Sequence, residues 1–190
     1  MEYVYMTVQS PVGELKLVAR GEKLAAILWE NDKPNRVRLG AMRADAGSPV
    51  LVETARQLAE YFAGTRKQFD VEMDFAGTEF QKQVWAALLT IPYGDTRSYS
   101  DIAHQIGRPS AVRAVGAANG KNPISIIAPC HRVIGMSGDL TGFAGGLHAK
   151  ETLLMVEGAA ALKREKRAAP RKTEKVDHST QGLLFETGLA

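Results

Sequence analysis

Apolar and polar positions alternate along much of the first thirty residues, and a period of two is typical of half-buried β-strands. The alternation over 3–10 predicts a first strand, and turn residues at 11–13 lead into a second strand over 14–19. A third strand is expected over 24–30, after a turn at 21–23. Because such short turns join neighbouring strands, the pattern predicts a small antiparallel sheet.

A helical period follows these strands. Ser48 is suited to cap a helix that continues to Gly64, with apolar residues recurring on one face. The polar segment 31–47 is expected to be loop with some helix, and the alternating segment 69–75 is expected to be extended. These elements predict an α/β N-terminal domain over 1–76, made of a small antiparallel sheet plus a helix.

The pattern then changes to short helices separated by turns. Thr78 and Gln81 have the spacing of a capping box, which predicts a helix over 79–90. The sequence therefore predicts a mostly α-helical C-terminal domain over 77–158, followed by a flexible tail over 159–190.

The C-terminal domain contains a helix-turn-helix pattern. Ser100 is placed to cap a short helix over 101–105, and residues 107–110 form a turn. Ser110 is placed to cap a second helix over 111–119. Two short helices joined by a glycine-containing turn are typical of helix-turn-helix units that bind DNA.

The second of these helices is almost bare of long side chains. Its small residues are Ala111, Ala114, Gly116, Ala117 and Ala118. Arg113 is its one long cation. Ordinary recognition helices carry several long polar side chains, whereas a bare helix can approach the narrow minor groove and project one arginine into the base stack. Tight packing in a core would need the same composition, so the helix alone leaves both interpretations open.

Positive charge is concentrated on the same region. The whole chain has a net charge of only +3, but the segment 97–132 holds one acidic residue, Asp101, and several basic ones. The basic residues are Arg97, Arg108, Arg113, Lys121 and Arg132. A local excess of cations is the electrostatic pattern that binds phosphates, although a solvated basic face would carry the same charges.

Cys130 is the only cysteine among the 190 residues, which excludes an internal disulfide and a thiolate-rich zinc site. An inert core thiol and a reactive nucleophile both remain open. His131 follows directly, and an imidazole near a thiol can take its proton, either directly or through a water molecule. The apolar run 124–128 before the cysteine is strand-like, so the thiol is expected at a corner that closes a strand.

These motifs together resemble the O6-alkylguanine-DNA alkyltransferases, also called methylated-DNA–protein-cysteine methyltransferases. The similarity is close over 78–158 and weaker over 1–76. The matching motifs are Phe80-Gln81, Val84-Trp85, Leu88, Ile91 to Gly94, Ser98-Tyr99, Arg113 to Gly116, Asn122-Pro123, Pro129 to Val133, Gly145 to Leu147, Lys150-Glu151, Leu153-Leu154 and Glu157-Gly158.

The resemblance implies DNA repair by a single, irreversible transfer of the alkyl group from O6-alkylguanine in double-stranded DNA to Cys130, with O4-alkylthymine as a further substrate to test. His131 would take the thiol proton through a water molecule, and Glu157 would orient that histidine. Tyr99 would contact the flipped base and the adjacent phosphate, and Asn122 would organise the turn beside the cysteine. The resemblance implies neither a cofactor nor a metal.

The resemblance also implies the DNA-contacting residues. Arg113 would fill the gap that the extruded base leaves in the stack. The other implied contacts are Tyr99, Ser110, Ala114 and Ala117 for DNA, and Val133, Phe143 and Ala144 for the substrate pocket. Phe143-Ala144 stand where some relatives have Tyr-Ser, and Ser125 stands where some have proline. These differences leave open which alkyl adducts the pocket accepts.

Two other function classes are alternatives to alkyl transfer. A non-enzymatic binder of alkylated lesions belongs to a related type that lacks the acceptor cysteine, and the presence of Cys130 opposes it. A cysteine hydrolase would need an oxyanion hole and direct contact between thiol and imidazole, which adjacent residues rarely achieve.

The segment 163–175 carries seven basic residues and two acidic ones, which is typical of a solvated tail that can contact DNA phosphates. Gln181 to Phe185 resembles the short peptides by which bacterial DNA-metabolism proteins dock on the sliding clamp, so the clamp is an expected partner. A tail end that packs on its own domain is the alternative.

Composition places this chain among ordinary soluble proteins, with 45% hydrophobic and 24% charged residues. It contains no apolar run of 18 residues, so no membrane span is expected, and Met1 to Val12 lacks the pattern of a signal peptide. A free reactive thiol suits the reducing cytoplasm, where we expect a monomer.

Overall fold

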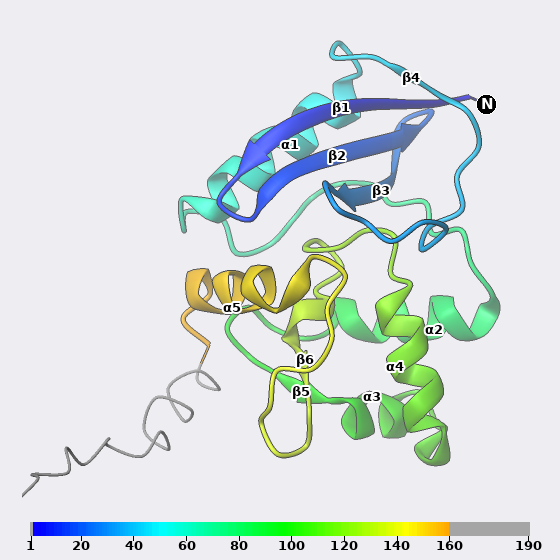
Figure 1. The fold of residues 1–190 in the computed structure, drawn as a ribbon, viewed down its shortest axis with the longest axis vertical. Coiled ribbons are helices and arrows are strands. Elements are labelled where there is room, and N and C mark those ends of the chain that lie inside the picture. Colours follow the sequence, from blue (N-terminus) through cyan, green and yellow to red (C-terminus); the bar gives the residue numbers. More distant parts are fainter. Residues whose placement is uncertain (1, 160–190) are drawn as a thin grey trace, which may run out of the picture.

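The computed structural model describes residues 2–159 of the chain, which form two lobes stacked along the long axis of the molecule (Figure 1). The N-terminal lobe holds a four-stranded sheet with strand order β3-β2-β1-β4 and one helix, α1. The C-terminal lobe is mainly helical. The predicted sequence of an α/β lobe followed by a helical lobe is therefore confirmed.

Three strands of the sheet lie close to the predicted positions. They are β1 (Tyr3–Ser10), β2 (Gly13–Arg20) and β3 (Lys23–Trp29), and both consecutive pairs are antiparallel. The turn between β1 and β2 requires a positive φ of 98° at Gly13, which glycine adopts without strain.

One prediction for the N-terminal lobe was wrong. The segment 31–47 contains no helix but a short strand, β4 (Met42–Ala44), which pairs in parallel with β1, so the sheet is mixed rather than purely antiparallel. The backbone of β1 would otherwise present unpaired groups at the sheet edge, and three residues of a polar segment are enough to cover part of it. A strand of three residues is too short to show a periodic pattern in the sequence.

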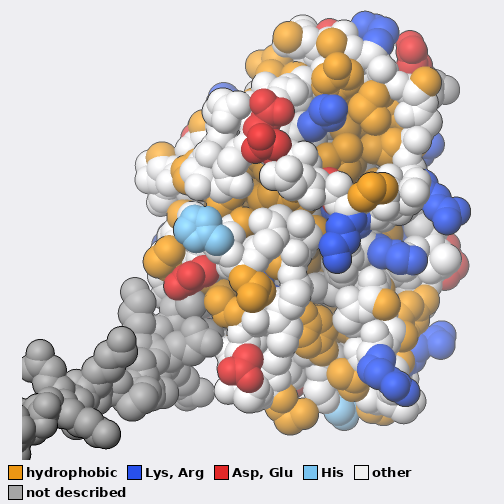
Figure 2. Space-filling model, in the orientation of Figure 1, with side chains coloured by type: hydrophobic (Ala, Val, Ile, Leu, Met, Phe, Trp, Pro, Cys, Tyr) orange, Lys and Arg blue, Asp and Glu red, His pale blue; other side chains and the backbone are white. Residues whose placement is uncertain are grey.

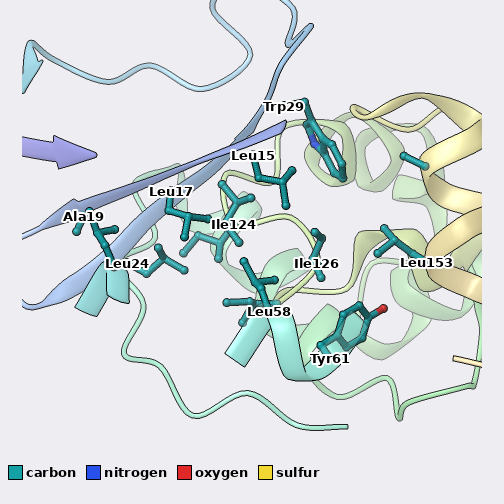
Figure 3. Packing of buried hydrophobic residues seen from close by; sticks show 14 residues of the cluster. Leu15, Leu17, Ala19, Leu24, Trp29, Leu58, Tyr61, Ile124, Ile126 and Leu153 are labelled. Carbon is teal, nitrogen blue, oxygen red and sulfur yellow. The ribbon is translucent and has the colours of Figure 1, made fainter. Parts of the chain in front are cut away.

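Helix α1 (Pro49–Phe62) begins at the predicted place, with Pro49 in its first turn, although the Ser48 side chain makes no capping hydrogen bond. The helix packs on the sheet through Leu51, Leu58 and Tyr61, which are 0–2% exposed. Figure 3 shows Leu58 and Tyr61 facing apolar side chains of β2 and β3 and of the segment after α4.

The C-terminal lobe is built from short elements. They are α2 (Glu79–Leu89), β5 (Arg97–Ser98), α3 (Tyr99–Gln105), a 3-10 turn at Pro109–Ala111, α4 (Val112–Gly120), a second 3-10 turn at Cys130–Arg132, β6 (Val133–Ile134) and α5 (Gly146–Val156). The capping box of α2 is present as predicted, with Gln81 N donating to Thr78 Oγ1 and Thr78 N donating to Gln81 Oε1.

The predicted caps of the helix-turn-helix were wrong. Ser98, not Ser100, caps α3, because Ser98 and Asp101 exchange two hydrogen bonds in a capping box, at 2.8 and 3.1 Å. The helix therefore starts at Tyr99 rather than Asp101. Ser110 lies within the 3-10 turn, and α4 starts at Val112 without a side-chain cap.

The strand-like run 124–128 was also predicted incorrectly. Only Ile124 forms a bridge, to Ile27 of β3, and Ile126 adopts a positive φ of 74°, which turns the chain. Both isoleucines are fully buried among apolar residues of the N-terminal lobe. The run is apolar because it fills the space between the lobes, not because it belongs to a sheet.

We expect Ser98→Ala to lower the free energy of unfolding by about 1 kcal/mol, since it removes a side-chain cap that pairs with Asp101. The matched variant Ser100→Ala should stay within about 0.5 kcal/mol of the wild type. Urea unfolding followed by circular dichroism measures both. Equal losses for the two serines would contradict the assignment of the cap.

Candidate active site

Cys130 opens the 3-10 turn that follows the buried loop, and it is 2% exposed. Asn122 shapes this loop from within, because its Nδ2 donates to Ala128 O at 2.7 Å while its Oδ1 accepts from Ile124 N at 3.1 Å. The asparagine side chain thus substitutes for backbone partners inside a loop that water does not reach. This fixes the position of the peptide that carries the thiol.

Burial raises the pKa of the Cys130 thiol above its ordinary value. The neighbouring side chains of Asn122 and Ser125 and the positive charges of Arg36 and Lys150 act in the opposite direction but do not overcome it. The resting thiol is therefore protonated at neutral pH, and any nucleophilic reaction needs a base to remove its proton.

His131 and Glu157 form a buried pair. His131 Nε2 lies 2.7 Å from Glu157 Oε1, and both side chains are 0% exposed. Burial alone would raise the pKa of Glu157, but hydrogen bonds from His131 and Arg132 and the positive charge of Arg132 lower it to about 2. Burial lowers the pKa of His131, although the carboxylate opposes this effect, so the imidazole is neutral at pH 7.

These charges decide the tautomer of the histidine. An ionised carboxylate can only accept, so the proton of the neutral ring lies on Nε2 and Nδ1 carries a lone pair. His131 Nδ1 is buried and has no hydrogen-bond partner within residues 2–159. The ring therefore offers a free basic nitrogen on the side away from Glu157.

The carboxylate of Glu157 has further partners. Arg132 donates to both oxygens, with Nε at 2.9 Å from Oε2 and a terminal nitrogen at 3.0 Å from Oε1. Gly94 N donates to Oε2 at 3.1 Å, and the hydroxyl of Tyr61 donates to Oε1 at 2.7 Å. Tyr61 belongs to α1, so the N-terminal lobe reaches directly into this network.

Lys150 is a second buried charge near the thiol. It is 0% exposed, and its Nζ donates to Val133 O at 2.6 Å and to Thr141 O at 3.0 Å. Burial lowers the pKa of Lys150 to about 8, while Cys130 opposes this shift. The lysine joins β6 to the loop 135–145 and places positive charge beside the sulfur.

The loop 135–145 carries two of the three predicted pocket residues, Phe143 and Ala144, while the third, Val133, lies in β6. Phe143 packs edge-on against Trp29, with ring centroids 5.3 Å apart, and also contacts the apolar cluster that includes Cys130. Ala144 packs against the N-terminal lobe. Thr141 Oγ1 donates to the hydroxyl of Tyr99 at 3.0 Å, so this loop is joined to the start of α3.

Helix α4 presents a narrow exposed stripe. One face of the helix is exposed and consists of Arg113, Ala114, Ala117 and Gly120, which recur at helical spacing. Val115 and Ala118, on the other side, are buried. Ser110 is exposed in the turn before the helix. Val115 thus lies inward, and the exposed face of the helix is made mainly of small residues.

No helix within residues 2–159 has the length and apolar character needed to cross a bilayer. The same residues contain no group of three histidine, cysteine or acidic side chains placed to hold a metal ion.

Known proteins match both lobes. Residues 3–75 match the domain described as "6-O-methylguanine DNA methyltransferase, ribonuclease-like domain", and residues 79–159 match the "DNA binding domain" of the same description. The chain belongs to the 6-O-methylguanine DNA methyltransferase family. The resemblance inferred from the sequence motifs is thereby confirmed.

Similar members of this methyltransferase family come from distant organisms. A methylated-DNA–protein-cysteine methyltransferase of Mycobacterium tuberculosis is 51% identical over 159 residues, which cover 83% of this chain and 93% of the relative. One from Methanosarcina acetivorans is 48% identical over 155 residues, covering 82% and 98%. The crystal structure of Mycobacterium tuberculosis OGT in complex with DNA matches with a TM-score of 0.76 and 48% identity, covering 85% of this chain and 98% of that one.

Three residues of this candidate site were not assigned a role from the sequence. Arg132 and Lys150 stand within matching motifs, and an arginine that directly follows the cysteine and histidine is a usable signal for Arg132. Tyr61 carries no signal, since it lies 96 residues from Glu157 and reads as one more apolar position of α1.

We expect the stability of this methyltransferase to depend on pH through Glu157. Because folding lowers the pKa of this carboxyl from 4.5 to about 2, its stabilisation is complete above about pH 4.5 and is lost as the pH falls through 2. The loss is on the order of 3 kcal/mol for a shift of this size. Urea unfolding from pH 7 to pH 2 should show this loss for the wild type and not for Glu157→Gln.

The exposed control Glu22→Gln should follow the wild type. If the free energy of unfolding depends on pH in the same way in all three proteins, the assignment to Glu157 is contradicted.

Proposed function

We propose that this protein repairs DNA by transferring the alkyl group from O6 of guanine in duplex DNA to Cys130 Sγ, once per molecule. The observation that carries the proposal is a buried thiol that directly precedes a histidine whose Nε2 lies 2.7 Å from Glu157 Oε1 and whose Nδ1 has no hydrogen-bond partner within residues 2–159. Relatives about 50% identical over most of this chain bear the name of this activity.

The reaction begins with removal of the thiol proton. His131 Nδ1 takes it through one water molecule, since side chains of adjacent residues rarely contact each other directly. The imidazolium then lies against ionised Glu157, whose other partners hold the carboxylate in place. The positive charges of Lys150 and Arg36 favour the thiolate as it forms.

The thiolate attacks the alkyl carbon in line with the bond to the purine. The S–C bond forms while the C–O6 bond breaks, and the electron pair of the broken bond goes to the guanine oxygen. Tyr99 supplies a proton or hydrogen bond to the departing guanine. The product is a thioether, and no residue of this site can reverse it, so the protein is consumed.

The exposed stripe of α4 suits the minor groove. Ala114 and Ala117 let the helix backbone approach closely, and Arg113 projects from the same face to fill the space of the flipped nucleotide. Flipping costs a few kcal/mol, and less for a lesion that already pairs badly. A related protein of 48% identity has been solved in complex with DNA, which supports DNA as the partner.

The flipped base would enter beside the thiol between Tyr99 and the loop 135–145. Val133 lies in the Cys130 cluster and its carbonyl is held by Lys150, while Phe143 and Ala144 form the opposite wall. We assign the size preference for alkyl adducts to this loop, and O4-alkylthymine is the second substrate to be tested.

The decisive experiment uses a duplex with labelled O6-methylguanine. We expect one label per wild-type molecule, found by mass spectrometry on the peptide that contains Cys130, and none on Cys130→Ser. The variant should still bind the duplex, because its DNA-facing residues are unchanged. Binding without transfer by the wild type would favour a lesion-binding protein instead. Turnover on an ester or amide would favour a hydrolase.

The segment from Gln181 to Phe185 lies outside the described residues. We propose from its sequence that it docks on a bacterial sliding clamp, with glutamine and two large apolar residues as anchors. In a pull-down with purified clamp, the wild type should bind and Gln181→Ala combined with Phe185→Ala should not. Equal capture of both proteins, or of neither, removes the idea.

We also assign the protein to the cytoplasm, because a reducing compartment suits its free thiol. We propose that it acts there as a monomer.

A further inference from the structure

A polar hollow of about 460 Å³ lies where the two lobes meet beside α4. Its walls come from the loop between β3 and β4, from the start of α2 and from the turn after α4. The lining includes the side chains of Arg36, Arg38, Thr78, Gln81 and Lys121. Figure 2 shows basic side chains gathered on this face of the molecule, beside the loop that leaves β3 and along α4.

Arg36 holds the two sides of the hollow together. Its guanidinium pairs with Asp32 on its own loop and donates to Asn122 O at 2.5 Å, and its side chain is only 6% exposed. The buried arginine therefore fixes the loop that carries Arg38 against the turn that carries Lys121. Its guanidinium nitrogens already donate to Asp32 and to Asn122 O, so Arg36 positions the two sides of the hollow and is not itself the phosphate-binding group.

Arg38 and Lys121 are different, because both are exposed and neither lies within 4.0 Å of a carboxylate in residues 2–159. Several other surface cations, such as Arg43 and Lys23, are paired with acidic side chains. Two uncompensated positive charges on one hollow, contributed by different lobes, attract an anion.

The hollow is aligned with the exposed stripe of α4. Lys121 follows the last residue of this helix, eight residues after Arg113, which corresponds to about 12 Å along the helix axis. That length is three to four nucleotide steps at about 3.4 Å per step along one strand. If Arg113 occupies the place of the flipped nucleotide, this length brings Lys121 within reach of a phosphate of the flanking duplex, and Arg38 lines the same hollow.

We propose that Arg38 and Lys121 bind phosphates of the DNA that flanks the lesion, so that the N-terminal lobe contributes directly to DNA binding. This inference rests on the proposed function, since its ligand is the DNA substrate. The contact carries no sequence information, because phosphates are the same at every step. It adds affinity and fixes how the duplex lies across both lobes.

The test compares the wild type with Arg38→Gln combined with Lys121→Gln. Binding to a fluorescent duplex that extends well beyond the lesion on both sides is measured over a range of KCl concentrations. Each lost phosphate contact lowers the magnitude of the slope of log K against log salt concentration by about one, so the slope of the double variant should be smaller by about two.

Affinity should fall equally for damaged and undamaged duplexes. Transfer from a free O6-alkylguanine base should keep the wild-type rate, because that substrate has no phosphates.

Lys23→Gln combined with Arg43→Gln is the matched control, since it removes the same charge from exposed positions outside the hollow. An unchanged slope in the first variant, or an equal fall in both variants, would overturn the proposal. A lost reaction with the free base would also overturn it, because the residues would then serve the thiol site. If the double variant shows the expected smaller slope while the wild type transfers no alkyl group from damaged DNA, the proposed function fails and the phosphate site stands.

Discussion

The site depends on one buried carboxylate. Glu157 follows α5, yet it accepts hydrogen bonds from Tyr61 of α1, from Gly94 before β5, and from His131 and Arg132 beside the cysteine. A buried carboxylate with this many donors stays ionised, and an ionised carboxylate dictates which nitrogen of the histidine carries the proton. The same contacts bring four separate stretches of chain to one point, so the chemistry and the packing of the lobes share a single interaction.

Burial and nucleophilicity place opposing demands on Cys130. Burial favours the protonated thiol, so the nucleophilic role that we propose for Cys130 needs a base, and we assign that role to His131, whose Nδ1 has no hydrogen-bond partner within residues 2–159. The positive charge of Lys150 acts to lower the pKa of the thiol. The same burial disfavours the charged form of the lysine and lowers its own pKa to about 8. Two backbone carbonyls accept hydrogen bonds from its ammonium group, and they belong to β6 and to the loop 135–145. One charge thus supports both the sulfur and the walls around it.

Local patterns predicted the elements that local forces create. The three long strands, α1 and the capping box of α2 follow from alternation, helical period and residue spacing within a few positions. Errors arose where distant packing decides. The strand β4 exists because the edge of β1 needs partners, and the run 124–128 is apolar because it lies between the lobes. Ser98 rather than Ser100 caps α3, because only Ser98 is followed three residues later by an acidic residue, Asp101, that completes a capping box.

The sequence by itself determined the family and the order of the two lobes, because those depend on short motifs whose spacing is visible along the chain. It did not determine how Glu157 is held or that Tyr61 takes part, since that hydrogen bond joins residues 96 positions apart. It also gave no sign that Arg38 and Lys121 share one hollow. Contacts of this kind form only when the lobes pack together, and no local propensity records them.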